Sequence, residues 1–251
     1  MKFRPPKRRK MAIRRWFLLP LAMAWALSFS WGWAVAQSPA ALAAHGVTVA
    51  VDPGHGGKDV GAKGSMGTTE NQICLTLAQR LTQMLELSYR VVLTRGDDFE
   101  ISQSERSAIA NNQKADMLIS IHTGAGFVHA AGGVVIYYYQ PTAKSAGPSG
   151  STLSGEGLTP WQDLQLSHRA DSQRLARHLK TAFEAVAGMP DVRLVSAPLL
   201  VLQGADMPAV VIEVGSLSNP AEEERLNNPL QQENLAQAIM KGLEGYLAEG
   251  H

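Results

Sequence analysis

Two kinds of apolar segment alternate along the chain after residue 46, and this alternation limits the fold more than any other feature. Short continuous apolar runs predict buried strands, whereas apolar residues spaced three or four apart predict helices. The expected strands cover residues 47–52, 89–94, 116–122, 133–139, 199–202 and 209–214. This order predicts an α/β fold: a single domain with a largely parallel mixed sheet of about six strands and helices on both faces.

Four helices are expected between these strands. The first covers residues 70–87, with Thr68 or Thr69 as its cap, and the second begins at the capping-box sequence Ser102-Gln103-Ser104-Glu105. Two later stripes at helical spacing consist of Leu175, Leu179, Phe183 and Val186, and of Leu235, Ile239, Leu243 and Tyr246. Residues 140–164 are rich in Pro, Gly and Ser, and we expect a functional or mobile loop there.

Charge is distributed unevenly along the 251 residues. Residues 1–36 hold eight of the 23 Lys and Arg and none of the 22 Asp and Glu, so residues 37–251 carry 15 basic and 22 acidic side chains, a net charge of −7. A body of this charge argues against a nucleic-acid partner, whose binding face would be basic. The one cysteine, Cys74, excludes an internal disulfide, and its place in an apolar stripe indicates a buried small hydrophobic residue.

The first 36 residues have the order of an export signal. A basic stretch leads into the uncharged residues 16–35, and Ala34-Val35-Ala36 then supplies a cleavage sequence. Arg14-Arg15 before Trp-Phe-Leu resembles a twin-arginine signal, and an uncleaved membrane anchor is the alternative. We therefore expect a signal peptide at residues 1–36 and one catalytic domain at residues 37–251. The domain would be periplasmic or extracellular, and would meet the membrane only through the export signal.

Three chemically versatile residues stand at the carboxyl ends of strands, where ligands of open α/β sheets bind, and a fourth begins a helix. His55 follows the first expected strand, His122 ends the third, and Glu213 lies near the end of the last. Glu70 begins the first helix on its apolar side, and an ionised carboxylate there is costly unless it is paired or binds a metal. His55, Glu70 and His122 suit a zinc ion with a fourth position open for water, and Glu213 suits a nearby general base.

Each of these residues also has a simpler explanation. His55 can simply be part of a turn in the glycine-rich loop, and His122 can be a hydrogen-bonded core residue. Glu70 can be a helix N-terminal charge, and Glu213 can pair with Arg193 or Arg225. The glycine-rich loop after the first strand lacks the spacing of a phosphate-binding P-loop. The other five histidines (His45, His129, His168, His178 and His251) are interpreted as surface or packing residues.

The same residues carry a family resemblance that runs over residues 47–247. The matching segments are VAVDPGHGGKDVGAKGSMGTTEN, LTRGDD with SERSAIAN, ADMLISIH, and PAVVIEVGSLSN with Leu226 after it. They resemble the zinc-dependent N-acetylmuramoyl-L-alanine amidases, the type 3 cell-wall amidases. The resemblance implies a phosphorylase/hydrolase-like fold, zinc on His55, Glu70 and His122, and Glu213 as the catalytic carboxylate.

The chain departs from the family pattern at three places. Thr123 and Gly124 follow the last proposed ligand, Ser216 replaces an aromatic residue, and Asn71 replaces a lysine. Thr123, Gly124 and Ser216 are expected near the site. Residues 140–164 are too short and too rich in Gly and Pro for the inhibitory helix of related division amidases. We therefore expect that no regulatory partner controls access to the active site. We also expect a monomer.

The resemblance implies a zinc hydrolase that cleaves the amide between N-acetylmuramic acid and L-alanine in peptidoglycan, using a zinc-bound water and a glutamate as general base and acid. Together with the export signal, this predicts an exported enzyme. Two alternatives stay open. A non-catalytic peptidoglycan-binding protein on the same scaffold would bind cell-wall sacculi without releasing peptide. A zinc peptidase acting on stem peptides would free amino acids and leave the sugar–peptide amide intact.

Overall fold

The computed structural model describes residues 46–124, 132–141, 161–186 and 191–250. All of them belong to one compact unit. The expected export signal therefore lies outside the described residues. Within the described ranges, no helix combines the length and the apolar character needed to cross a membrane.

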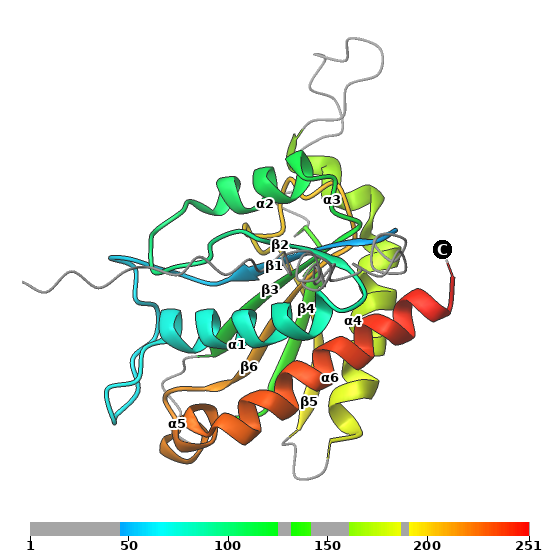
Figure 1. The fold of residues 1–251 in the computed structure, drawn as a ribbon. Coiled ribbons are helices and arrows are strands. Elements are labelled where there is room, and N and C mark those ends of the chain that lie inside the picture. Colours follow the sequence, from blue (N-terminus) through cyan, green and yellow to red (C-terminus); the bar gives the residue numbers. More distant parts are fainter. Residues whose placement is uncertain (1–45, 125–131, 142–160, 187–190, 251) are drawn as a thin grey trace, which may run out of the picture. The chain divides into compact units, whose positions relative to one another are not determined.

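A six-stranded mixed sheet forms the centre of this unit (Figure 1). Its strands are β1 (Thr48–Pro53), β2 (Arg90–Leu93), β3 (Met117–Gly124), β4 (Val134–Tyr139), β5 (Val192–Ala197) and β6 (Ala209–Ser216), in the order β2-β1-β3-β6-β4-β5. Every neighbouring pair is parallel except β4 and β6, which are antiparallel. The predicted α/β class with a largely parallel mixed sheet is confirmed.

One predicted strand is wrong. Residues 199–202 form turns, with amide-to-carbonyl bonds three residues apart from Leu202 to Leu199 and from Ala205 to Leu202. The sixth strand is β5, just before this segment. It was missed because it lies at the sheet edge and is poorly buried, with Val192 buried and Arg193, Val195 and Ser196 exposed. The apolar run is explained by packing instead, since Leu202 and Ala205 are buried in a small second core.

All four expected helices are present. They are α1 (Glu70–Leu85), α2 (Gln103–Asn112), α4 (Arg169–Glu184) and α6 (Pro229–Ala248); the 3₁₀ turn η2 (Trp161–Asp163) and the shorter helices α3 (Leu164–Ser167) and α5 (Pro220–Asn227) were not predicted. Ser102 and Glu105 form the predicted capping box of α2. Thr69 is the N-cap residue of α1 by position, but its side chain makes no cap hydrogen bond. Of the expected loop at 140–164, residues 142–160 lie outside the described residues.

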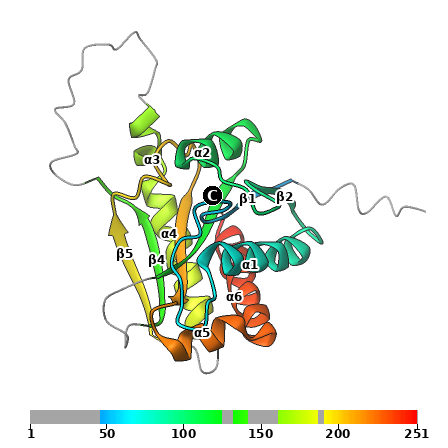
Figure 2. The ribbon, with the colours of Figure 1, turned by 90° about the vertical axis from the view of Figure 1, so that its left-hand side faces the viewer.

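The two faces of the sheet are covered unequally. Helices α1, α4 and α6 pack on the first face, while α2 and the turns after β5 cover the second (Figures 1 and 2). Alternate strand residues point to opposite faces. The first core includes Val49, Val51, Ile119, Ile121, Ile212 and Val214, and the second is smaller and includes Ala50, Leu118 and Val211. The second face therefore has room for a site at the carboxyl ends of β1, β3 and β6.

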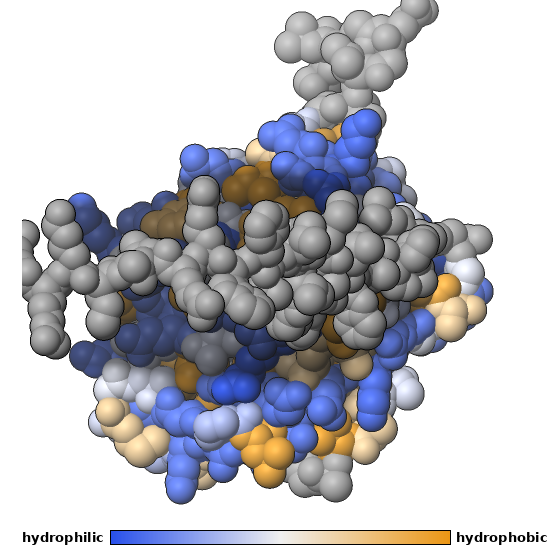
Figure 3. Space-filling view, viewed as in Figure 1, coloured by the Kyte–Doolittle hydropathy of each residue, from blue (hydrophilic) through white to orange (hydrophobic). Residues whose placement is uncertain are grey.

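The outward sides of the covering helices are polar, as the amphipathic stripes predict. On the side of the molecule seen in Figure 3, hydrophilic residues dominate the described surface, and apolar side chains form separate small areas. The buried stripe of α6 consists of Leu235, Ile239, Leu243 and Tyr246, and that of α4 contains Leu175, Leu179 and Phe183.

Helices α4 and α6 approach each other closely at a glycine. A Cβ atom on Gly242 would lie 2.7 Å from the Leu179 Cα, which is backbone and cannot rotate away. A Cβ on Gly245, on the same helix, would meet only the His178 ring at 3.0 Å.

We expect Gly242→Ala to lower the free energy of unfolding by about 1–3 kcal/mol, because the two helices must separate. The control Gly245→Ala should stay within about 1 kcal/mol of the wild type, because alanine favours helix and the half-exposed ring can move. Urea denaturation measures both. Equal stability of the two variants would contradict this close packing.

Candidate active site

A buried carboxylate anchors the loop that follows β1. Asp52, fully buried, accepts hydrogen bonds from Arg106 Nη1 at 2.7 Å, from Thr94 Oγ1 at 2.5 Å and from Ser120 Oγ at 2.6 Å. The donors come from α2, from the end of β2 and from β3. This one side chain therefore joins three elements to β1, and its charge is compensated by the Arg106 guanidinium.

Two buried arginines hold the carbonyl groups of the same loop. Arg106 donates to Pro53 O at 2.7 Å and to His55 O at 2.9 Å. Arg95 donates to Pro53 O at 3.0 Å and to Gly54 O at 2.7 Å. These bonds fix the loop while His55 has a φ of 56°, a left-handed conformation that is unfavourable for residues other than glycine. The arginines therefore compensate for backbone strain at a proposed site residue.

Glu70 lies between the two predicted histidine ligands. Its Oε2 is 3.1 Å from His55 Nε2 and its Oε1 is 3.1 Å from His122 Nδ1. The backbone amides of Ala62 and Thr123 each donate to it at 2.9 Å. Burial opposes ionisation, but the hydrogen bonds from His122 and His55 outweigh it and lower the pKa of Glu70. The carboxylate is thus kept ionised in a buried position.

The donor set fits a divalent metal ion. His55, Glu70 and His122 each offer a ligand atom, and these atoms lie within 4.8 Å of one another. His122 Nε2 is buried and has no hydrogen-bond partner in the described part of the chain. Asp59 Oδ2 lies 2.8 Å from His55 Nδ1, an outer carboxylate of the kind that orients metal-binding imidazoles. Two imidazoles and one carboxylate are a set that zinc accepts.

Glu213 lies on the strand next to His122. The two residues are register partners of the parallel pair β3 and β6. Glu213 Oε2 accepts a hydrogen bond from the Tyr137 hydroxyl at 3.1 Å. Burial raises the pKa of Glu213, and the Tyr137 hydrogen bond partly opposes this shift. Burial and the neighbouring Glu213 raise the pKa of Tyr137 to about 12.

The arginine pairing considered for Glu213 does not occur among the described contacts. Arg225 instead pairs with Glu222 at 2.7 Å and donates to Val214 O at 3.0 Å. Arg193 lies on β5, beyond β4, and its ion pair is with Asp191.

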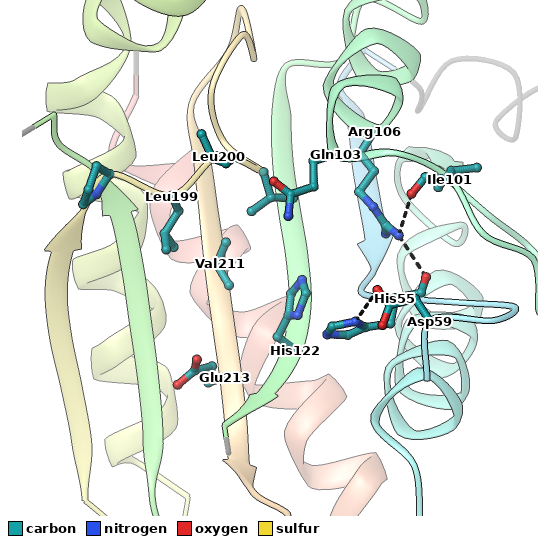
Figure 4. Close-up of a pocket in the computed structure, with 12 residues that line it drawn as sticks. His55, Asp59, Ile101, Gln103, Arg106, His122, Leu199, Leu200, Val211 and Glu213 are labelled. Atoms are coloured by element: carbon teal, nitrogen blue, oxygen red, sulfur yellow. Dashed lines mark hydrogen bonds and ion pairs between the residues drawn. The ribbon is translucent and has the colours of Figure 1, made fainter. Parts of the chain in front are cut away.

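The proposed site opens into a pocket of about 450 Å³ (Figure 4). One side is polar and the other is formed by the apolar turn after β5. The lining residues are His55, Asp59, Ile101, Gln103, Arg106, His122, Pro198, Leu199, Leu200, Val201, Val211 and Glu213. All four residues singled out in the sequence therefore lie together, three of them lining the pocket and Glu70 behind the two histidines.

Two of the residues that depart from the family pattern, Thr123 and Gly124, lie beside the proposed site, as expected. Thr123 contacts Glu70 through its backbone amide, and a Cβ on Gly124 would lie 3.3 Å from Glu213 Oε2. Ser216 is buried at the end of β6, with its hydroxyl 2.8 Å from that of Ser218. Asn71 Nδ2 donates to Asp98 at 3.0 Å.

The remaining histidines and the cysteine agree with the simple interpretations wherever the structure describes them. His168 and His178 form exposed ion pairs with Asp206 and Glu249. Cys74 is fully buried. His45, His129 and His251 lie outside the described residues.

Comparison with known proteins identifies the class. The chain matches the N-acetylmuramoyl-L-alanine amidase family (Amidase_3) over residues 49–245 and belongs to that family. It is 33% identical over 227 residues to the probable N-acetylmuramoyl-L-alanine amidase AmiB of Haemophilus influenzae, covering 80% of this chain and 52% of that protein. To AmiC of Escherichia coli O6:H1 it is 28% identical, covering 81% and 54%. The chain thus spans about half the length of the curated relatives it matches.

Solved structures agree with this assignment. The catalytic domain of the amidase CwlV from Bacillus (Paenibacillus) polymyxa has a TM-score of 0.66 and 30% identity, with 80% of this chain and 98% of that chain covered. An amidase from Clostridium difficile 630 has a TM-score of 0.68 and 29% identity, with 82% and 98% covered. The predicted resemblance and the α/β fold are confirmed.

Removing the charge of Arg106 tests the anchor of the His55 loop. We expect Arg106→Met to lower the free energy of unfolding by about 3–5 kcal/mol, because Asp52 is left buried without its counter-charge. The half-exposed ion pair of Arg80 and Glu233, 3.8 Å apart, supplies the control Glu233→Gln, which removes the charge of Glu233 and leaves the Arg80 hydrogen bond to Gln232 in place; a loss of about 1 kcal/mol or less is expected. Similar losses in both variants, measured by urea denaturation, would show that the buried pair has no special role.

Proposed function

We propose that this protein hydrolyses the amide between the lactyl group of N-acetylmuramic acid and L-alanine of the peptidoglycan stem peptide. One observation supports this most strongly: a buried carboxylate, Glu70, lies between two imidazoles, and a second carboxylate, Glu213, stands in register on the next strand. Membership in the N-acetylmuramoyl-L-alanine amidase family supplies the substrate class.

In this proposal His55, Glu70 and His122 hold zinc. When bound, zinc supplies Lewis-acid chemistry by polarising the amide carbonyl and lowering the pKa of water. Asp59 holds one nitrogen of the His55 ring, so the other nitrogen faces Glu70. The amide of Thr123 keeps a Glu70 oxygen in place. Any residue type except proline offers that backbone amide, so the change from the family pattern at this position leaves the proposed ligand set intact.

Glu213 carries the proton transfers. Its carboxylate accepts a proton from the attacking water, whose oxygen forms a bond to the carbonyl carbon. It then donates that proton to the alanine nitrogen as the carbon–nitrogen bond breaks, releasing a carboxylic acid and an amine. Burial keeps the pKa of Glu213 above that of a solvated glutamate, which suits a group that must both take up and release a proton. The Tyr137 hydroxyl orients the carboxylate.

The rest of the chain gives the proposed protein its setting. We propose that residues 1–36 are an export signal, of twin-arginine or general secretory type, and that residues 37–251 form the catalytic domain outside the cytoplasmic membrane, acting as a monomer on peptidoglycan. Among the solved relatives, the CwlD amidase of Clostridioides difficile was obtained in complex with the GerS lipoprotein. For the present chain, access without a gating partner stays a prediction, which activation of the purified protein by a partner protein would overturn.

Two variants separate metal binding from proton transfer. We expect Glu213→Gln to retain zinc and to lose at least about 100-fold in activity on purified sacculi, since no proton acceptor remains. His122→Ala should lose both zinc and activity. Elemental analysis measures the metal, and mass spectrometry measures released stem peptides. The exposed Glu224→Gln serves as the control and should behave as the wild type. A fully active Glu213→Gln would refute its assignment.

Removal of the Tyr137 hydroxyl should shift the pH profile. The hydroxyl donates to the ionised Glu213 and thereby lowers its pKa, so Tyr137→Phe raises this pKa. Because the base must be ionised, the acid limb of kcat/KM should move to higher pH. An acid limb that stays in place, or moves to lower pH, would show that Tyr137 does not act on Glu213.

A further inference from the structure

A cationic side chain shares the sheet face of Glu213, two strands away. Val135 on β4 is the register partner of Glu213 on one side and of Arg193 on the other. Side chains in register across a sheet point to the same face. Glu213, Val135 and Arg193 therefore form a row across β6, β4 and β5, on the face that carries the pocket.

The packing of β5 confirms this orientation. Val192 is part of the first core and Leu194 packs against it, so both point to the face covered by α4 and α6. Arg193 and Val195 alternate with them and point to the other face, where both are exposed. With strands about 4.8 Å apart, the Cα atoms of Glu213 and Arg193 are about 10 Å apart.

Arg193 is available for a ligand. Among the residues that the structure describes, its ion pair is with Asp191, with Arg193 Nε 3.8 Å from Asp191 Oδ2, and both side chains are more than half exposed. This separation exceeds a hydrogen bond, so the planar guanidinium can still bind a carboxylate through two parallel N–H donors.

The proposed reaction gives the substrate a direction across this face. Glu213 donates a proton to the leaving amine, so the peptide side of the scissile bond lies at Glu213. The His55, Glu70 and His122 cluster lies on the other side, toward β3 and β1. In Figure 4 the Glu213 carboxylate points away from β3 toward β4. A peptide that continues in this direction passes Val135 and Tyr137 and reaches β5.

The distances match a carboxylate close to the scissile bond. Two residues of extended chain span at most about 7 Å. The Cα atoms of Glu213 and Arg193 are about 10 Å apart, and their two side chains bridge the part of this distance that the peptide does not span. A negative group on the residue after the released alanine would therefore meet the Arg193 guanidinium.

We propose that Arg193 binds a free carboxylate on the second residue of the leaving peptide and so makes the protein prefer a stem peptide with this carboxylate over its amidated form. This specificity role rests on the proposed amidase function, but the position of Arg193 beside the pocket does not.

Two synthetic substrates test the proposal with the purified full chain loaded with zinc. Both are N-acetylmuramoyl-L-alanyl-glutamate derivatives in which the γ-carboxyl group of the glutamate is blocked; the α-carboxyl group of this second residue is free in one and is a carboxamide in the other. We expect the wild type to prefer the carboxylate substrate about fivefold in kcat/KM, as a solvated ion pair allows, mainly through KM. Arg193→Gln should abolish the preference and leave the amidated substrate unaffected.

The control variant removes a positive charge on the opposite side of the sheet. Arg177 is exposed on α4, which covers the first face, and Arg177→Gln should keep the preference. If Arg193→Gln retains the wild-type preference, or weakens both substrates equally, the proposal is wrong.

A binding measurement separates failure of this proposal from failure of the amidase function. If the wild type cleaves neither substrate, the proposed function fails. Calorimetry with the two released dipeptides then decides the role of Arg193 in the metal-free protein. The proposal requires about fivefold tighter binding of the carboxylate peptide, abolished by Arg193→Gln and reduced by added salt. Equal binding of both peptides to the wild type would overturn it.

Discussion

The buried ion pair of Asp52 and Arg106 is the interaction on which the site depends. It joins β1 to α2, while Thr94 and Ser120 tie the same carboxylate to β2 and β3. Arg106 and Arg95 also donate hydrogen bonds to the loop carbonyl groups of His55 and Gly54, and the backbone of His55 is left-handed. A histidine in such a conformation persists only where its surroundings fix it. The network therefore converts the end of a buried strand into a rigid support for one proposed metal ligand.

A second constraint is the unequal covering of the sheet. Three long helices bury the first face, whereas the second face has α2 and a set of turns. On the second face, every other residue of β3 and β6 points into the space that remains, which brings His122 and Glu213 side by side. Glu70 reaches this space from the first turn of α1 and lies against both imidazoles. A buried carboxylate becomes tolerable here because two backbone amides and two imidazoles compensate for its lost hydration.

The sequence predicts three of the four central residues for a simple reason: the carboxyl ends of parallel strands meet, so His55, His122 and Glu213 had to lie close together. Glu70 was predicted because an ionised carboxylate on the apolar side of a helix is costly unless it is paired or binds a metal. The supporting residues were missed although Asp59, Arg95 and Arg106 stand inside the quoted family segments, because no spacing rule connects a loop or helix residue to a carbonyl group on another element. Tyr137 was missed because the antiparallel pairing of β4 with β6 cannot be derived from an apolar run alone. The same limit explains the wrong strand at 199–202, where continuous apolar residues line a pocket or pack into the second core instead of forming a strand.

Hydrolysis in water enriched in oxygen-18 tests the central claim most directly. The purified protein, loaded with zinc, is incubated with an N-acetylmuramoyl-L-alanyl stem peptide, and the fragments are weighed by mass spectrometry beside an EDTA-treated sample. The proposed reaction places one heavy oxygen on the lactyl carboxylate and releases an unlabelled peptide that begins with alanine, only in the zinc-loaded sample. Label within the peptide would indicate a peptidase. An uncut substrate with zinc still bound would contradict the proposed activity and favour a protein that only binds peptidoglycan.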